Sequence, residues 1–235
     1  MQYIGFIPCR SGSERVPNKN TRPFAGFTGG LLELKLRQMA EIPELESILV
    51  SSNDPIVLDA TERYAHEVDD RIVPLERPDE YGRSSTSMDD FILYIAQLRA
   101  TGTIFWSHVT SPFITSSIYR DGLATYEQAL SDGHDCLVSV TRTQRFFWTE
   151  QGPVNYDNTV EKWPRSQDLT PLLEINHALY VMPFKSMREV GDRIGRQPYF
   201  YDIDEHDAAD IDWEPQFVTL EKLALLKRQA GEGLI

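Results

Sequence analysis

The chain begins with the apolar run Tyr3-Ile4-Gly5-Phe6-Ile7-Pro8, and the polar segment Arg10-Ser11-Gly12-Ser13 follows almost directly. A short apolar run that ends in turn-forming residues is typical of a buried β-strand. The polar loop continues to Pro23 and is rich in Ser, Gly, Asn, Arg and Pro. In an open α/β sheet, ligands bind beyond the carboxyl ends of the strands. The opening segment therefore predicts a strand with a binding loop at its end.

The rest of the chain alternates between apolar runs and segments with helical spacing. We expect strands at 47–52, 71–74, 103–109, 135–141, 178–182 and 209–212, and helices at 31–42, 54–66, 84–100, 115–131 and 215–229. This alternation indicates an α/β protein whose mainly parallel sheet is covered by helices on both faces. No linker or repeat divides the chain, so residues 1–235 are expected to form a single domain.

The alternation breaks between residues 142 and 171. This segment contains Phe146, Phe147 and Trp148, then Gly152-Pro153, then Trp163. The pattern indicates an excursion that carries a hairpin. Its aromatic side chains could belong to the core, or they could form an insertion that packs on a second subunit.

The composition narrows the possible partners. The net charge is −13 and 41% of the 235 residues are hydrophobic, so the chain can build a core but repels nucleic acid and anionic membranes. No apolar run approaches the ~20 residues that span a bilayer. The start of the chain lacks the basic region of a signal peptide, and we expect a cytoplasmic protein. Cys9 and Cys136 are expected to be reduced, buried thiols.

An acidic protein needs a local group of cations to bind an anion, and the first loop carries Arg10, Arg15, Lys19 and Arg22. The backbone N–H groups of Ser11, Gly12 and Ser13 could form an anion-binding nest, with Arg10 and Lys19 neutralising further charge. The loop matches neither the P-loop nor the dinucleotide-binding pattern. A solvated surface turn with scattered basic residues is the alternative.

Asp210-Ile211-Asp212 carries the second set of candidate ligands. On a strand, residues two apart point to the same side, and two carboxylates at a strand end suit a hard cation such as Mg²⁺. Asp202-Ile203-Asp204 has the same spacing. The alternative is a pair of ordinary acids in an acidic chain.

Two further segments carry polar groups at expected strand ends. Arg77 could recognise a base or a phosphate, while the hydroxyls of 84–87 could bind a ligand or cap the next helix. His108 precedes the polar loop Thr110-Ser111-Pro112 and is either a cleft residue or a hydrogen-bonded core histidine.

The order and spacing of these segments resemble the acylneuraminate cytidylyltransferase family, the CMP–sialic acid synthetases. The resemblance covers nearly the whole chain and rests on Ile7-Pro8-Cys9-Arg10-Ser11-Gly12-Ser13 with Lys19-Asn20, on 48–54, on Arg77-Pro78 with the Ser/Thr run, on Thr110-Ser111-Pro112, on 165–169, on 176–180 and on Asp210-Ile211-Asp212.

The resemblance implies a three-layer αβα sandwich with a Rossmann-like sheet, and a homodimer in which 142–171 reaches the neighbouring site. It implies CTP as donor, an acidic small-molecule acceptor, Mg²⁺ as cofactor and pyrophosphate as product. Nucleotide-binding residues would be Arg10, Ser11, Gly12, Ser13, Lys19, Asn20, Arg77 and Ser85. Acceptor-binding residues would be His108, Thr110, Ser111, Arg165, Gln167, Asn176 and His177. Catalysis would rest on Arg10, Lys19 and His108, and Asp210 and Asp212 would bind the metal.

Three positions depart from the family pattern, and all lie on the acceptor side. His108 replaces the usual Gln, His177 the usual Gly, and Glu174 stands where an acceptor-binding Arg often sits. The resemblance implies a nonulosonic (sialic-type) acid as the acceptor, and the three departures leave 3-deoxy-manno-octulosonate or a phosphonate as alternatives. His108 could act as a general base or donate a hydrogen bond to the acceptor.

A protein that binds a nucleotide without catalysing a reaction is the alternative from a different class of function. The cations of the first loop and the paired aspartates argue against it.

Overall fold

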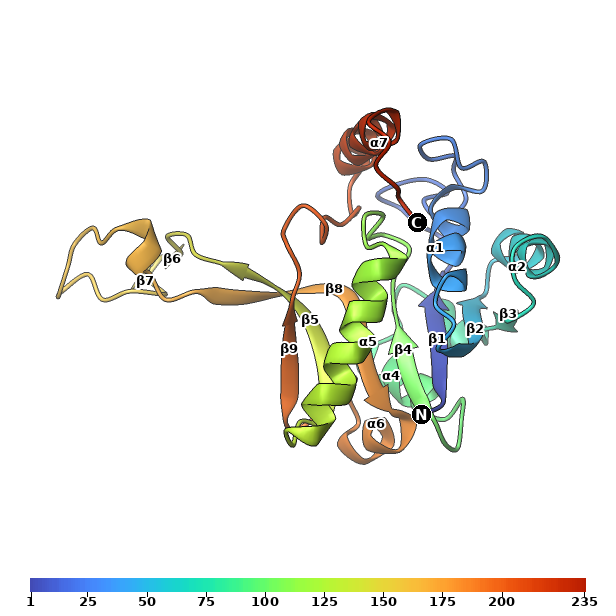
Figure 1. Ribbon diagram of the computed structural model, residues 1–235, viewed down its shortest axis with the longest axis horizontal. Helices are drawn as coiled ribbons and strands as arrows, with labels where there is room; N and C mark the ends of the chain where they lie inside the picture. Colours follow the sequence, from blue (N-terminus) through green and yellow to red (C-terminus); the bar gives the residue numbers. More distant parts are fainter.

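The computed structural model describes residues 1–235 as an α/β protein built on a seven-stranded sheet (Figure 1). Across the sheet the strands follow the order β3-β2-β1-β4-β8-β5-β9. Their bounds are β1 (Tyr3–Pro8), β2 (Leu45–Ser52), β3 (Ile72–Glu76), β4 (Thr103–Trp106), β5 (Cys136–Thr143), β8 (Leu172–Pro183) and β9 (Pro198–Asp202). Only β8 runs antiparallel to its neighbours, so the expected mainly parallel sheet is confirmed.

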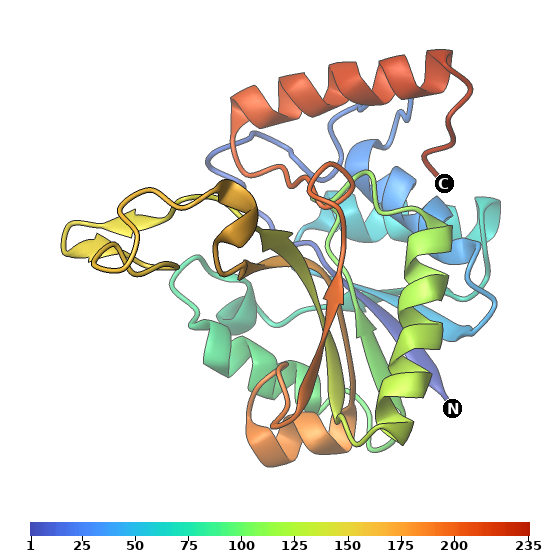
Figure 2. The ribbon, with the colours of Figure 1, turned by 60° about the vertical axis from the view of Figure 1, so that its left-hand side comes forward.

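Helices cover both faces of this sheet (Figures 1 and 2). Their bounds are α1 (Gly30–Ala40), α2 (Pro55–Glu67), α3 (Asp79–Gly82), α4 (Met88–Ala96), α5 (Ser116–Ser131), α6 (Phe184–Val190) and α7 (Glu214–Gln229). Strand β1 shows the two layers of core, because Tyr3 and Ile7 join the cluster under α1, α2 and α5, whereas Ile4 and Phe6 join the cluster under α4 and α6. The three-layer sandwich is confirmed. No helix has the length and apolar character needed to cross a bilayer.

Local sequence signals set several of these boundaries. The Asp54 side chain accepts a hydrogen bond from the Ile56 N–H at the start of α2, and Pro55 occupies the first turn. Ser87 caps α4 in the same way by accepting from the Asp90 N–H. Both capped starts agree with the sequence.

The last strand of the sheet lies elsewhere than expected. Segment 209–212 is not a strand. It contacts the loop after β4 through a hydrogen bond from the Ile211 N–H to the Thr110 carbonyl. The strand is β9, whose three consecutive residues Tyr199, Phe200 and Tyr201 favour an extended chain. The prediction for 209–212 was wrong because one buried apolar residue, Ile211, does not supply the alternation that a strand needs.

The excursion at 142–171 is an arm that leaves the body of the protein (Figure 1). Strands β5 and β8 continue as an antiparallel pair to Thr143 and Leu172, and a hairpin of β6 (Trp148–Thr149) and β7 (Gly152–Pro153) lies near the tip. A short 3₁₀ turn, η1 (Ser166–Asp168), leads back toward β8. Four aromatic rings pack edge-on or stacked along the arm: Phe146, Trp148, Tyr156 and Trp163. The expected hairpin is confirmed.

A charged side chain lies inside the larger core. Lys35 on α1 is fully buried, and its amine donates to the Ser111 carbonyl at 2.9 Å and to the Tyr119 hydroxyl at 2.6 Å. Burial lowers the pKa of Lys35 well below its usual value, although the carboxylate of Asp210 opposes the shift. The two hydrogen bonds that the amine donates fix the loop after β4 to α1 and α5.

This burial predicts how the stability depends on pH. Between the lowered folded pKa of Lys35 and the unfolded value of about 10.4, the unfolded chain binds a proton that the folded chain lacks, so the free energy of unfolding should rise with pH. Lys35→Met should flatten this rise in urea titrations taken from pH 7 to 10. Lys222→Met, at an exposed position of α7, is the matched control. Parallel curves for the wild type and Lys35→Met would contradict the assignment.

Candidate active site

A cavity of about 510 Å³ opens at the carboxyl ends of the parallel strands. Its walls come from the loop after β1, from the segment between β3 and α4, and from the end of β4. Five of its lining residues are cations: Arg10, Arg15, Lys19, Arg77 and Arg83. Glu14 is the one acid in the lining, although the chain as a whole carries a net charge of −13. Such a local excess of positive charge attracts a polyanion.

The loop after β1 is held by contacts at both of its ends. The Ser11 N–H donates to the Asn53 side chain at 3.0 Å, and the Asn20 amide donates to the Arg10 carbonyl. Gly12 has a φ of +71°, a conformation that favours glycine. Arg10, Ser13, Lys19 and Asn20 line the cavity, whereas Ser11 and Gly12 do not.

Arg77 is a buried residue of the cavity lining. It is almost fully buried, it donates to the Ser51 hydroxyl at 3.1 Å and the Ser51 carbonyl at 2.6 Å, and its guanidinium lies 4.3 Å from the centre of the Phe91 ring. No carboxylate pairs with it, and burial lowers its pKa to about 10. Arg77 therefore presents a fixed positive charge rather than a free hydrogen-bonding fork. Ser85 is exposed and is not part of the lining, while Ser84, Thr86 and Ser87 are.

His108 lines the cavity just beyond β4, and its Nε2 is buried without a hydrogen-bond partner. Burial, followed by the nearby charge of Arg193, lowers the pKa of His108 well below its usual value. A histidine held neutral in this way is a weak proton acceptor. The unpartnered Nε2 and the lowered pKa thus favour the hydrogen-bonding role for His108 over the role of general base.

The other expected acceptor residues lie in different environments. Thr110 lines the cavity, and His177 lies beside His108 with ring centroids 6.4 Å apart. Ser111 is fully buried in the loop that Lys35 holds, so the structure does not bring its hydroxyl to the cavity.

Asn176, Arg165 and Gln167 also lie away from the cavity lining. Asn176 is buried at the irregular point of the β5–β8 pairing, where it accepts from the Ser139 hydroxyl and donates to the Thr141 hydroxyl. Arg165 and Gln167 belong to the arm, and Arg165 pairs with Asp168 at 2.7 Å. Within one chain, these three residues are therefore structural or distant from the site.

The Asp210–Asp212 segment meets the cationic loop. The Lys19 amine donates to the Ile211 carbonyl at 2.8 Å and lies 3.9 Å from the Asp212 carboxylate, and Arg15 pairs with that carboxylate at 3.0 Å. Burial, together with the charge of Asp212, raises the pKa of Asp210. The Oδ1 atom of Asp210 is buried without a hydrogen-bond partner, which leaves an oxygen able to accept a cation.

No group of three or more His, Cys, Asp or Glu residues forms a complete metal site in the structure. A metal held by the two aspartates would need further oxygen ligands from water or from phosphates, as Mg²⁺ commonly does. The donor set of Asp210 and Asp212 fits such a cation.

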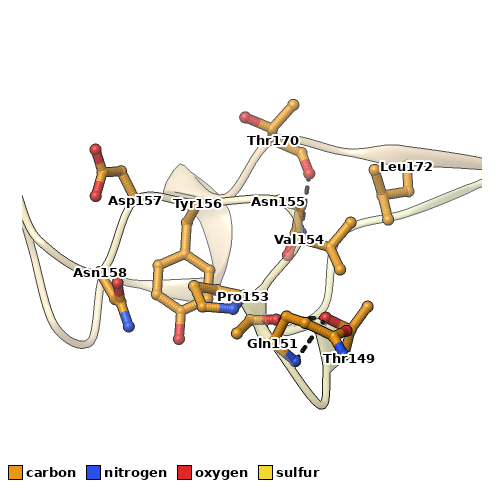
Figure 3. A pocket seen from close by; sticks show the side chains of 11 residues that line it. Thr149, Gln151, Pro153, Val154, Asn155, Tyr156, Asp157, Asn158, Thr170 and Leu172 are labelled. Atoms are coloured by element: carbon orange, nitrogen blue, oxygen red, sulfur yellow. Dashed lines mark hydrogen bonds between the residues drawn. The ribbon is translucent and has the colours of Figure 1, made fainter.

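A second cavity of about 550 Å³ lies in the arm (Figure 3). Figure 3 shows the Asn155 side chain bonded to the Thr170 carbonyl at its edge. Asp157 is its one charged lining residue, and no cation reaches it. Its charge does not suit a polyanion, so the first cavity is the candidate site.

Several residues of the site escape a reading of the sequence. Trp106 lines the cavity, and its position two residues before His108 was a usable signal because alternate residues of a strand share a face. Asn53 stands beside the clear helix signal of Asp54-Pro55, and nothing local marks it as the partner of Ser11. Arg22, expected in the cationic group, instead pairs with Glu214 of α7 at 2.7 Å.

Comparison with known proteins places this geometry in context. The sequence matches the family described as Cytidylyltransferase over residues 4–227. It is 23% identical over 199 residues to pseudaminic acid cytidylyltransferase of Campylobacter jejuni subsp. jejuni. The aligned region covers 80% of this chain and 82% of that protein.

Two solved structures share the fold. CMP:2-keto-3-deoxy-manno-octonic acid synthetase complexed with CTP has a TM-score of 0.64 at 14% identity and covers 98% of this chain and 100% of that one. 4-Diphosphocytidyl-2C-methyl-D-erythritol synthase of Anaerococcus prevotii has a TM-score of 0.66 at 10% identity, with 97% and 98% covered. The resemblance to the CMP–sialic acid synthetases is thereby supported, and the family match over almost the whole length shows that this chain belongs to the cytidylyltransferase family.

Proposed function

We propose that this protein transfers CMP from CTP to a nonulosonic-type sugar acid and releases pyrophosphate. The observation that carries the proposal is the cationic cavity after β1, which Lys19 joins to the Asp210–Asp212 segment in an otherwise acidic molecule. The acceptor class is supported by the relative that acts as a pseudaminic acid cytidylyltransferase.

In the reaction, a hydroxyl oxygen of the acceptor attacks the α-phosphorus of CTP in line. The new P–O bond forms as the bond from that phosphorus to the bridging oxygen of the β-phosphate breaks, and the hydroxyl proton passes to solvent or to a base. Binding both substrates in one cavity and neutralising the phosphate charge supply most of the acceleration that such a displacement needs from a protein.

We assign the phosphates to the side of the cavity formed by the first loop. Arg10 has no carboxylate partner and is exposed at the cavity, so its guanidinium is free to form a forked contact with phosphate oxygens. Lys19 adds a point charge, and the N–H groups and hydroxyl near Ser13 add neutral donors. Asn20 would lie near the ribose and Arg77 near the base.

Asp210 and Asp212 would hold Mg²⁺. The buried, unpartnered Oδ1 of Asp210 and the carboxylate of Asp212 are hard oxygen ligands. The ion would offset the negative charge on the departing pyrophosphate.

The arm is proposed to form a homodimer. Trp163 is 65% exposed, and Trp148 and Phe146 beside it are exposed as well. Such a cluster of exposed aromatic side chains is typical of a protein–protein interface. Pairing of two arms would cover these rings and could bring Arg165 of one chain toward the site of the other.

Pyrophosphate release across a panel of acids tests the function. With CTP and Mg²⁺, we expect turnover with pseudaminic acid or another nonulosonic acid, and weaker turnover with 3-deoxy-manno-octulosonate. Turnover with a phosphonate alone would contradict the sugar-acid assignment. Binding of CTP without turnover of any acid would favour the non-catalytic module.

Substitution of the aspartates tests the metal assignment. Asp212→Asn should raise the Mg²⁺ concentration needed for half-maximal turnover by about 10-fold or more, because a carboxylate ligand is lost. Asp204→Asn removes an exposed carboxylate with the same local spacing and should leave this concentration unchanged. An identical Mg²⁺ dependence for both variants would remove Asp212 from the metal site.

The oligomeric state tests the arm. Sedimentation should give the mass of two chains for the wild type, and Trp163→Ser should weaken the dimer by about 10-fold or more because a large aromatic contact is lost. Leu226→Ser changes an exposed apolar residue of α7 outside the arm and serves as the control. A monomeric wild type at micromolar concentration would exclude the dimer.

A further inference from the structure

Arg193 lies next to the candidate site in the loop between α6 and β9, and no motif singles it out. Its guanidinium carbon is 4.3 Å from the centre of the Tyr180 ring and 5.2 Å from that of the Trp106 ring. One of its terminal nitrogens lies 3.3 Å from the Nδ1 atom of His177. The side chain therefore lies across aromatic residues of β4 and β8, at the wall that also carries His108.

The charge of Arg193 has no counterion in the protein. None of the ion pairs in the structure includes it, and the carboxylate of the adjacent Asp192 accepts the backbone N–H groups of Arg193 and Ile194 instead. Rings stabilise such a cation only in part. An unpaired, half-buried guanidinium in a chain of net charge −13 is a place where a ligand anion would complete the pairing.

Both neighbouring imidazoles are arranged as neutral groups. A guanidinium can only donate, so the Nδ1 of His177, which faces Arg193 and the Tyr180 hydroxyl, is its unprotonated nitrogen and its Nε2 carries the proton. Burial and the charge of Arg193 lower the pKa of His177, and they lower that of His108 further. The two imidazoles beside Arg193 are therefore uncharged. They can form hydrogen bonds with a ligand, and they do not need a counterion.

The position of these groups sets them apart from the phosphate side. Trp106 and His108 line the cavity, and the Trp106 and His108 rings stack with centroids 5.9 Å apart. Arg193 is not part of this lining but adjoins it at Trp106 and His177, and it is partly exposed, whereas Arg10 and Lys19 belong to the first loop. Glu174, the residue at the position where a cation was expected for the acceptor, is exposed on β8 and cannot bind a carboxylate.

We propose that Arg193, together with His177 and His108, forms the subsite that binds the carboxylate of the acceptor. Arg193 replaces, from a different part of the chain, the cation that Glu174 does not provide. The subsite selects acids over neutral sugars and holds the acceptor beside the nucleotide. This inference rests on the proposed function and names the residue that determines its specificity for an acid.

The test compares Arg193→Gln and Arg193→Lys with the wild type, using pseudaminic acid and its carboxamide as acceptors. Loss of a charge-assisted bond should raise the KM for the acid by about 10- to 100-fold and leave the KM for CTP within about 2-fold. Arg193→Lys should recover only part of the loss, because a lysine lacks the planar fork. The preference of the wild type for the acid over the carboxamide should largely disappear in Arg193→Gln.

Arg196→Gln is the matched control, since Arg196 is an exposed arginine of the same loop whose side chain makes no hydrogen bond or ion pair. It should behave as the wild type. An unchanged KM for the acid in Arg193→Gln, or an equal rise in the KM for CTP, would overturn the subsite while leaving the proposed function standing. If Arg193→Gln does not fold, a normal KM for the acid in folded Arg193→Lys overturns the subsite equally. Turnover of none of the acids by the wild type would instead overturn the proposed function, and the subsite with it.

Discussion

The hydrogen bond from the Lys19 amine to the Ile211 carbonyl, 2.8 Å long, is the contact on which the site depends. It joins the loop after the first strand to the segment before the last helix, two parts of the chain that are 192 residues apart. The amine also approaches Asp212, and Arg22 pairs with Glu214 at the start of α7. The last helix is thereby fixed over the first loop (Figure 2). The cations of one segment and the carboxylates of the other meet at the same end of the sheet.

The electrostatics of the molecule follow from this arrangement. An acidic surface repels a triphosphate at long range, so binding depends on a local field within the cavity. Arg10 and Arg83 supply unpaired charge at its mouth, and the buried Arg77 supplies a charge that water screens poorly. Lys19 has a different role, because the Asp210–Asp212 segment already balances much of its charge.

Local chemistry explains which parts of the structure the sequence could predict. The apolar run of β1 and the Asp54-Pro55 start of α2 are encoded by residues next to one another, and they were predicted correctly. The cap of α4 was expected only within 84–87, and the structure assigns it to Ser87. The last strand was not predicted correctly, because the paired aspartates drew attention to 209–212, although the aromatic run of β9 itself favours an extended chain.

The acceptor side of the site depends on contacts that no local pattern contains. Ser111 is buried because Lys35, far earlier in the chain, binds its carbonyl group inside the core. Arg193 meets His177 and Tyr180 through the return of the chain after α6. Such pairings require the folded chain, which is why more of the expected residues of the first loop than of the expected acceptor residues line the cavity.

Calorimetric titration of CTP into the magnesium-containing protein tests the central link most directly. We expect measurable heat and saturable binding for the wild type, with the affinity for CTP reduced by about 10-fold or more in Lys19→Met, because the loop loses both a cation and its hydrogen bond to Ile211. Lys222→Met, on the outside of α7, should bind as the wild type does. Equal affinity of the wild type and Lys19→Met for CTP, or no heat of binding in folded wild-type protein, would contradict the role of Lys19 in CTP binding.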